Sequence, residues 1–160
     1  MIMNPATEDA IVNSIPHLRA FAISLCRNRD QADDLVQETL TRGIAHIASF
    51  EEGSNLAAWL TTILRNQFYN EIRSSKRIAQ DTEGWHARSI AVPPDQDGWD
   101  ITEDLRAGLG KLSSAHRQAL YLVSASGLSY EAAAAIAECP PGTMKSRVNR
   151  ARTALAAFIS

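Results

Sequence analysis

The sequence predicts an all-α protein in which two small helical domains are joined by an acidic linker. Apolar residues recur at helical spacing through most of the 160 residues. Alternating β-branched runs, the signal of half-buried strands, are nearly absent. The segment 78–102 breaks the helical period with Pro93-Pro94 and two glycines. We therefore expect an N-terminal domain over 1–77, a linker over 78–102 and a C-terminal domain over 103–160.

The first two expected helices are amphipathic. In the stretch IPHLRAFAISLCRN, Pro16 suits a first turn or a kink. The apolar stripe of this helix is Leu18, Phe21, Ala22 and Leu25. The second helix covers DQADDLVQETLTRGIAHIASF, and its first turn is acidic, which complements the positive end of the helix dipole. Its apolar positions are Leu35, Leu40, Ile44 and Ile47.

The third expected helix runs from about Asn55 to Lys76 and has two different faces. The broad apolar face is expected to be buried and consists of Leu56, Trp59, Leu60, Ile63, Leu64 and Phe68. The other face carries, at four-residue spacing and beside Thr62, the residues Arg65, Tyr69, Arg73 and Arg77. Basic residues with an interleaved ring suit a single nucleic-acid strand, because charge follows the backbone while the ring stacks on a base. Tyr69 could equally be a half-buried packing residue.

The C-terminal domain is expected to hold helices at about 103–111, 114–125, 129–137 and 141–158. The stretch LSYEAAAAIAECPPGTMKSRV indicates a helix, a tight turn and a second helix, the motif that places its second helix in the DNA major groove. Ser129 can cap the first of these helices, and Pro141 suits the first turn of the second. Three alanines keep the first helix thin enough for a close crossing: Ala132, Ala133 and Ala135.

The last helix is positive on one side although the chain carries a net charge of −2. At 100° per residue, its apolar stripe is Met144, Val148, Ala151, Leu155 and Phe158. The rest of the helix carries side chains of the kinds that contact phosphates and base edges: Thr143, Lys145, Ser146, Arg147, Asn149, Arg150 and Arg152. The alternative is a basic, solvated helix of an ordinary bundle.

Other classes of protein find little support in the composition. A secretion signal and an apolar stretch of membrane-spanning length are absent, so we expect no membrane contact and a cytoplasmic location. Cys26 and Cys139 stand in unrelated contexts, which argues against a disulfide. The histidines show no ligand spacing, so no metal or other cofactor is expected. Paired carboxylates and nucleophile–base motifs do not stand out, which argues against an enzyme, and no dimerisation helix is evident, which favours a monomer.

Three segments resemble bacterial sigma factors of the extracytoplasmic-function (ECF) group: DQADDLVQETLTR, SNLAAWLTTILRNQFYNEIR and LSYEAAAAIAECPPGTMKSRVNRARTAL. The resemblance covers nearly the whole chain except the linker. Three shorter segments are most similar in sequence to the EcfG-type branch, which runs a general stress response: IPHLRAFAISLCRN, TILRNQFY and SASGLSYEAAA. The resemblance implies a transcription initiation factor whose partners are core RNA polymerase, promoter DNA and an anti-sigma factor.

The resemblance also implies roles for individual positions. The acidic helix would dock on the coiled coil of the polymerase β′ subunit through Asp33, Asp34, Leu35, Gln37, Glu38 and Thr39. The loop 51–55 and the third helix would open and read the −10 region through Ser54, Asn55, Arg65, Asn66, Tyr69, Arg73 and Arg77. The last helix would read the −35 region, with Arg152 on phosphate, and the β flap is a further implied polymerase contact. The linker, with seven acidic residues and one arginine over 78–104, would suit a basic RNA exit channel.

Two positions depart from the family's pattern. Gly43-Ile44 stands where Ala-Trp is often found, and glycine inside a helix costs about 1 kcal/mol relative to alanine, so helix stability or polymerase docking is in doubt there. Glu138 occupies a turn position where glycine is common. A positive φ at that position would be mildly strained for glutamate, so the turn could have a different shape.

Two other functions compete with the sigma-factor interpretation. A conventional helix-turn-helix regulator would need a dimer interface and palindromic half-sites. A sigma mimic that only titrates an anti-sigma factor would have no reason to keep a DNA-reading face.

Overall fold

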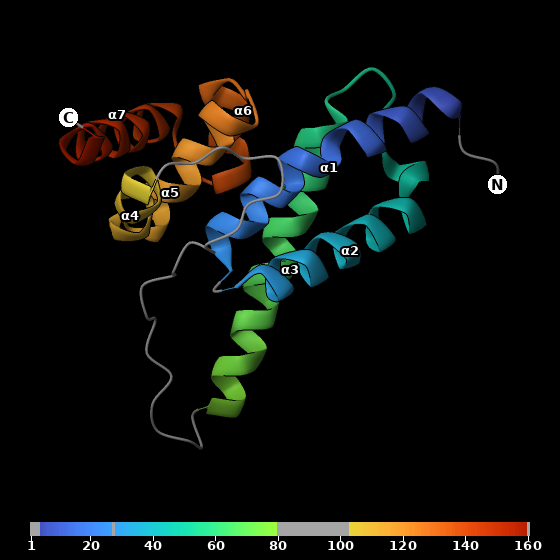
Figure 1. Ribbon diagram of the computed structural model, residues 1–160. Helices are drawn as coiled ribbons and strands as arrows, with labels where there is room; N and C mark the ends of the chain where they lie inside the picture. Colours follow the sequence, from blue (N-terminus) through green and yellow to red (C-terminus); the bar gives the residue numbers. More distant parts are fainter. Residues whose placement is uncertain (1–3, 27, 80–102, 160) are drawn as a thin grey trace.

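The computed structural model describes residues 4–26, 28–79 and 103–159, and over these ranges the chain is helical without strands (Figure 1). The expected linker therefore lies outside the described residues from position 80 to 102. The elements in chain order are α1 (Pro5–Leu25), α2 (Arg29–Ala45), the 3-10 helix η1 (Ile47–Ser49), α3 (Leu56–Ala79), α4 (Glu103–Lys111), α5 (Ser114–Leu120), the π-helix η2 (Tyr121–Ala125), α6 (Tyr130–Ala137) and α7 (Pro141–Ile159). None of the helices in these ranges is long and apolar enough to span a membrane.

Helix α1 starts earlier than expected. Pro5 occupies its first turn, and the Asn4 side chain caps it by accepting a 3.0 Å hydrogen bond from the Ala6 N–H. Of the two roles expected for Pro16, the first turn is wrong, because Pro16 lies inside α1, and the kink stays a prediction. The proline ring is exposed, where the carbonyl that loses its N–H partner has access to water, while Ile11 and Leu18 on either side are buried.

Helices α1, α2 and α3 pack against one another to form the N-terminal bundle. The predicted stripe of α1 is confirmed, because Leu18, Phe21, Ala22 and Leu25 are all buried. On α3 the buried apolar residues are Leu56, Leu60 and Leu64, while Trp59, Ile63 and Phe68 are half-buried. The α2 stripe is partly wrong: Leu35 is buried, but Ile44 is 48% exposed and the helix ends before Ile47.

Gly43 is the point of closest approach between α2 and α3. A Cβ atom at this position would lie 2.5 Å from Cδ2 of Leu60 and 3.7 Å from Cζ3 of Trp59. Leu60 is fully buried, so its methyl group has little room to move. Gly43 therefore has a packing role that the sequence did not reveal, since the missing side chain lets the two helices touch.

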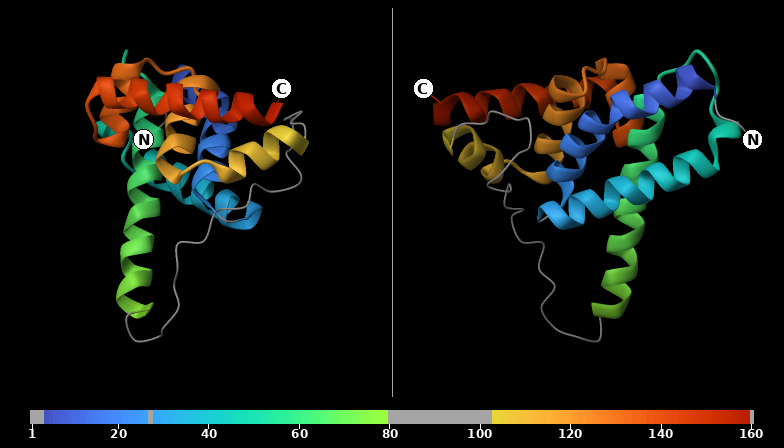
Figure 2. Two further views of the ribbon diagram at one scale, coloured as in Figure 1. Left: turned by 90° about the vertical axis from the view of Figure 1, so that its left-hand side faces the viewer. Right: turned by 45° about the vertical axis from the view of Figure 1, so that its right-hand side comes forward.

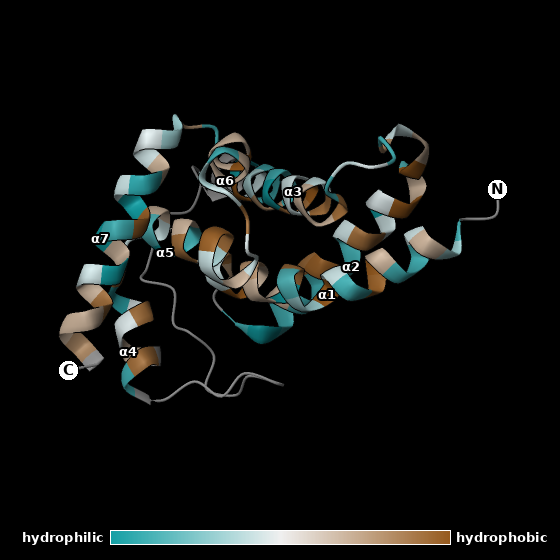
Figure 3. Ribbon diagram, turned by 90° about the horizontal axis from the view of Figure 1, so that it is seen from above, coloured by the Kyte–Doolittle hydropathy of each residue, from teal (hydrophilic) through white to brown (hydrophobic). Residues whose placement is uncertain are grey.

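In the C-terminal bundle, α7 packs against α4, α5 and α6. Its predicted stripe is buried at Met144, Val148, Ala151 and Leu155, whereas Phe158 remains 38% exposed. The close crossing of α6 is made by Ala133 and the neighbouring Ala134, which are buried, and not by Ala135, which is exposed. Figure 3 shows hydrophilic and hydrophobic residues alternating along α1 and α7, as amphipathic helices require.

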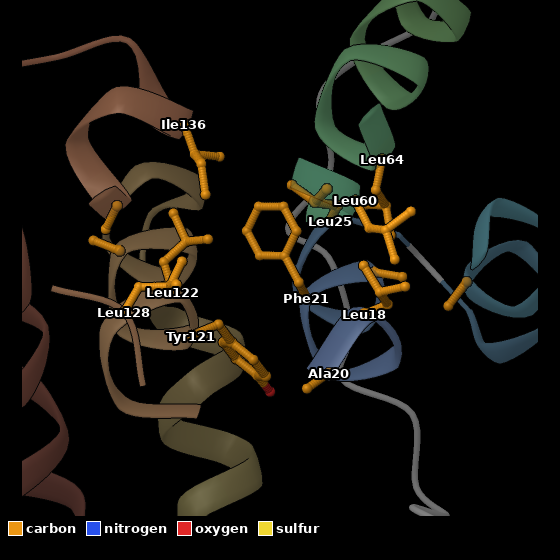
Figure 4. Packing of buried hydrophobic residues seen from close by; sticks show 14 of the residues in the cluster. Leu18, Ala20, Phe21, Leu25, Leu60, Leu64, Tyr121, Leu122, Leu128 and Ile136 are labelled. Atoms are coloured by element: carbon orange, nitrogen blue, oxygen red, sulfur yellow. The ribbon is translucent and has the colours of Figure 1, made fainter. Parts of the chain in front are cut away.

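The two bundles touch directly. Phe21 of α1 points toward Leu122 and Ile136 of the C-terminal bundle, so the buried apolar residues form one continuous cluster (Figure 4). Arg117 of α5 is 2% exposed and donates to the carbonyl oxygens of Leu112 (2.8 Å), Leu109 (3.1 Å) and Ser24 (3.3 Å). Burial lowers the pKa of the Arg117 guanidinium from its ordinary value. The last turns of α3 project away from both bundles (Figure 2).

We expect Gly43→Ala to lower the free energy of unfolding relative to Gly110→Ala by about 1–3 kcal/mol, because the added methyl group overpacks the α2–α3 contact. Gly110, in α4, is the matched control, since a Cβ there would meet nothing within 4 Å. Both substitutions gain helix propensity, so their difference isolates the packing cost. Urea unfolding of the full chain measures it. Equal stability of the two variants would contradict the role assigned to Gly43.

Candidate nucleic-acid interfaces

The helix-turn-helix is formed by α6 and α7. Ser129 caps α6 as predicted, because its Oγ accepts a 3.1 Å hydrogen bond from the Ala132 N–H. Helix α6 ends at Ala137, and its C-cap residue Glu138 has φ 58° and ψ 46°, the left-handed conformation. The expected change in turn shape is not needed, since the glutamate itself adopts the left-handed conformation. Helix α7 then begins at Pro141, as predicted.

The polar side of α7 is open to solvent. We call it the α7 polar face, and it consists of Thr143, Lys145, Ser146, Arg147, Asn149, Arg150 and Arg152. Thr143 and Arg147 are half-buried, and the other five are exposed. Arg152 leans toward η2, where its Nη2 donates to Ser124 Oγ over 3.4 Å. The face therefore brings together every residue predicted for duplex recognition.

The residues predicted for single-strand recognition form a second surface, the α3 basic face, made of Ser54, Asn55, Arg65, Asn66, Tyr69, Arg73 and Arg77. Asn66 and Arg73 are exposed, and Arg73 donates to Asn70 Oδ1 over 2.8 Å. Arg65 and Tyr69 lie under the C-terminal bundle, with the Arg65 side chain only 16% exposed. Arg77 lies in the last turns of α3, outside the residues whose side chains are described.

The loop before α3 borders a hollow of about 620 Å³. Its walls include Ser54 and Phe50 from the loop and Thr7 from the first turn of α1. Phe50 is stacked on Trp59 with 5.3 Å between the ring centroids, which fixes this wall. Asn55 has a structural task that the sequence did not reveal, since its Oδ1 accepts from the Ala58 N–H over 3.1 Å at the start of α3.

The residues of α2 predicted to dock on polymerase divide into an exposed group and a group that is half-buried or buried. Asp34, Gln37 and Glu38 are exposed, and Glu38 pairs with Arg42 over 2.9 Å. Asp33 is half-buried and pairs with Arg19 of α1 over 3.2 Å. The remaining two predicted docking residues, Leu35 and Thr39, lie in the core. The structure thus separates three accessible docking candidates from residues that hold α2 in the bundle.

The cysteines are both free, as expected, and differ in accessibility. Cys139 is half-buried in the turn of the helix-turn-helix, whereas Cys26 is buried at the end of α1. Burial, with a smaller effect of Glu71, raises the pKa of the Cys26 thiol to about 12, so it stays protonated at neutral pH. Within the described residues no group of three or more potential metal ligands is brought together.

Comparison with known proteins identifies both halves of the chain. Residues 11–78 match the model of sigma-70 region 2, and residues 102–155 match the model of sigma-70, region 4. The chain is 52% identical over 159 residues to the ECF RNA polymerase sigma factor EcfG of Rhodopseudomonas palustris, covering 99% of this chain and 88% of that protein. It is 37% identical over 128 residues to the ECF sigma factor SigC of Mycobacterium tuberculosis, covering 79% and 69%.

Solved structures agree with this result. The sigma factor RpoE of Bartonella quintana, solved in complex with the anti-sigma factor NepR, superimposes with a TM-score of 0.83 at 47% identity over 98% of both chains. CnrH, solved with the cytosolic domain of CnrY, shares the fold with a TM-score of 0.61 at 20% identity, covering 96% of this chain and 86% of that one.

A region 2 domain followed by a region 4 domain defines a sigma factor of RNA polymerase. The chain belongs to the ECF sigma factors, and the EcfG-type branch predicted from the sequence is confirmed by the match to EcfG. It is therefore a transcription initiation factor.

Glu138 offers a test of the turn geometry. We expect the free energy of unfolding of Glu138→Gly to be about 0.5–1 kcal/mol higher than that of Glu138→Gln. Glycine removes the cost of the left-handed conformation, but it also raises the entropy of the unfolded chain, which offsets part of this stabilisation. Both variants lose the carboxylate, so their difference isolates the backbone effect. Thermal unfolding of the full chains measures it, and a less stable glycine variant would contradict the φ of 58°.

Proposed function

We propose that this sigma factor directs core RNA polymerase to promoters through two separate DNA-binding surfaces. The observation that carries the proposal is that α7 buries its whole apolar stripe up to Leu155 while its polar face stays exposed. Such a helix is free to enter a major groove without unpacking the domain. The functional domains are taken as 1–77 and 103–160, joined by the segment 78–102.

The α7 polar face is assigned to the duplex at the −35 region. Lys145, Arg147 and Arg150 supply cations, and Asn149 and Ser146 supply amide and hydroxyl groups, which are the groups that read base edges. Arg152 is assigned to phosphate, because its guanidinium already leans toward Ser124 at the margin of the face. Phosphate contacts position a helix without reading sequence.

The α3 basic face and the hollow beside the loop 51–55 are assigned to the unpaired −10 strand. Exposed Arg73 and Asn66 lie on the outer side of α3, and Ser54 lies at the rim of the hollow. Unstacking a base costs a few kcal/mol, so binding to polymerase must supply part of the free energy of strand opening. Asp34, Gln37 and Glu38 of α2 are assigned to polymerase docking on the β′ coiled coil, and the β flap is a second proposed contact.

An anti-sigma factor is a further proposed partner. The relative RpoE was solved with NepR bound, and a TM-score of 0.83 over 98% of both chains requires that both domains be placed alike in the two proteins. The arrangement of this chain therefore suits an anti-sigma factor of the same kind. Control by such a partner and similarity to EcfG together support a role in a stress response.

Run-off transcription with purified core polymerase on a promoter library tests the function. We expect Asn149→Ala and Arg150→Ala each to reduce transcription from selected promoters by about five-fold or more, since a good base contact contributes about 1–3 kcal/mol of discrimination. Lys111→Ala, which removes a cation from the same domain outside the α7 polar face, is the control. A sigma factor that gives no transcript but binds an anti-sigma factor tightly would be a sigma mimic.

The isolated protein should bind promoters poorly. If α7 neutralises about three phosphates, the slope of log affinity against log salt is about −2.7, and such weak electrostatics cannot hold a promoter in a chain of net charge −2. Fluorescence anisotropy of labelled promoter duplex over a salt series measures the slope with and without core polymerase. Tight, salt-resistant binding without polymerase would contradict this division of labour.

A further inference from the structure

Two residues of the α3 basic face, Arg65 and Tyr69, have partners in the C-terminal bundle. Tyr69 accepts a 2.8 Å hydrogen bond on its hydroxyl oxygen from Nε2 of Gln118 in α5. Gln118 is buried, and Ser114 Oγ accepts a second bond from the same amide over 3.0 Å. The amide is therefore held in place on one edge of the Tyr69 ring.

Arg65 is covered by the end of α6. Its guanidinium lies over the Tyr69 ring at 4.8 Å from the centroid. Its Nη2 donates to the Ala137 carbonyl over 3.4 Å, and its Nη1 lies 4.0 Å from a carboxylate oxygen of Glu138. The last carbonyls of a helix carry partial negative charge, so this end of α6 presents to Arg65 the same sign of charge that a DNA phosphate would present.

We propose that, in the free sigma factor, the C-terminal domain occupies the single-strand site on α3 and competes with the −10 strand for Arg65 and Tyr69. This inference rests on the proposed function of the α3 basic face. Other contacts hold the same arrangement: Arg117 donates to the Ser24 carbonyl, and His17 Nδ1 lies 3.1 Å from the Ala125 carbonyl oxygen. This packing of the C-terminal domain on α3, which we call closure, hides the middle of the α3 basic face.

The contacts of Arg65 to α6 contribute little to holding this closure. Both contacts to α6 are long, and the buried Nε has no hydrogen-bond partner. An unsatisfied buried donor of a charged group is costly, and release to water or to a phosphate removes that cost. Arg73 and Asn66 stay exposed in the closed arrangement, so a strand can bind at the margin of the face before the domains separate.

Gln118→Ala tests the proposal without touching the α3 basic face. It removes the bond to Tyr69 from the C-terminal side, so a gain in strand affinity cannot come from a changed strand site. Tyr69→Phe removes the same bond from the other side and keeps the ring for stacking. The probe is a fluorescein-labelled, mixed-sequence single-stranded DNA of about 15 nucleotides, a length chosen to span more than one strand-binding site, and small-angle scattering of the full chain reports the domain separation.

We expect both variants to have a larger radius of gyration and to bind the strand roughly two- to ten-fold more tightly. Loss of one net hydrogen bond raises the population of chains with separated domains by this factor, and the apparent affinity rises with that population. Tyr130→Phe, the matched loss of a hydroxyl within α6, should leave both readouts unchanged. Expansion without a gain in affinity would overturn the competition. Absence of expansion in both variants would overturn the closure.

A failure of the strand site itself gives a different pattern. If Arg73→Ala weakens strand binding while Gln118→Ala does not strengthen it, the α3 basic face stands and the competition is rejected. If Arg65→Ala and Arg73→Ala leave binding unchanged in a Gln118→Ala chain that has expanded, the assignment of the face to single strands is rejected, and the competition with it.

Discussion

The buried guanidinium of Arg117 is the interaction on which the two-domain arrangement depends. It joins the end of α4 and the loop that follows it to the end of α1 through the carbonyl oxygens of Leu109, Leu112 and Ser24. Hydrogen bonds from a charged donor contribute about 1.5–3 kcal/mol each, but this free energy must first offset the removal of the cation from water. Arg117 is only 2% exposed, so its bonds are shielded from solvent. The same group therefore shapes the C-terminal domain and orients it on the N-terminal one.

With the apolar stripes committed to these contacts, the polar sides of the helices are left for partners. On α7 nearly the whole polar side is exposed, so its positive charge is available to duplex DNA. On α3 the polar side is shared between solvent and the neighbouring domain. The difference arises from the positions of the two helices. Helix α7 lies at the outside of its bundle, whereas the middle of α3 faces the C-terminal bundle.

The sequence predicted well whatever is determined by local periodicity and capping. The helices of the C-terminal domain and the Ser129 cap depend on residues within a few positions of each other, and both are confirmed. Contacts between residues far apart in the chain were not predicted. Gln118 meets Tyr69 across 49 positions and Arg65 meets Ala137 across 72, and no pattern in either helix indicates the partner.

The same reason explains why the surroundings of Gly43 and Pro16 were not predicted. Helix propensity describes an isolated helix, and both glycine and proline have low helix propensity. Each is tolerated because of what lies beside it: Leu60 occupies the space above Gly43, and the ring of Pro16 faces solvent. The individual site residues remain predictions, since accessibility separates Asp34 from Leu35 but does not show what Asp34 binds.

The glycine contact between α2 and α3 has a mechanical consequence. Leu60 of α3 occupies the space where a side chain at Gly43 would stand, so a larger residue in α2 would push the two helices apart. If α2 meets the polymerase and α3 meets the unpaired strand, as proposed above, this contact would pass a displacement of α2 on to α3.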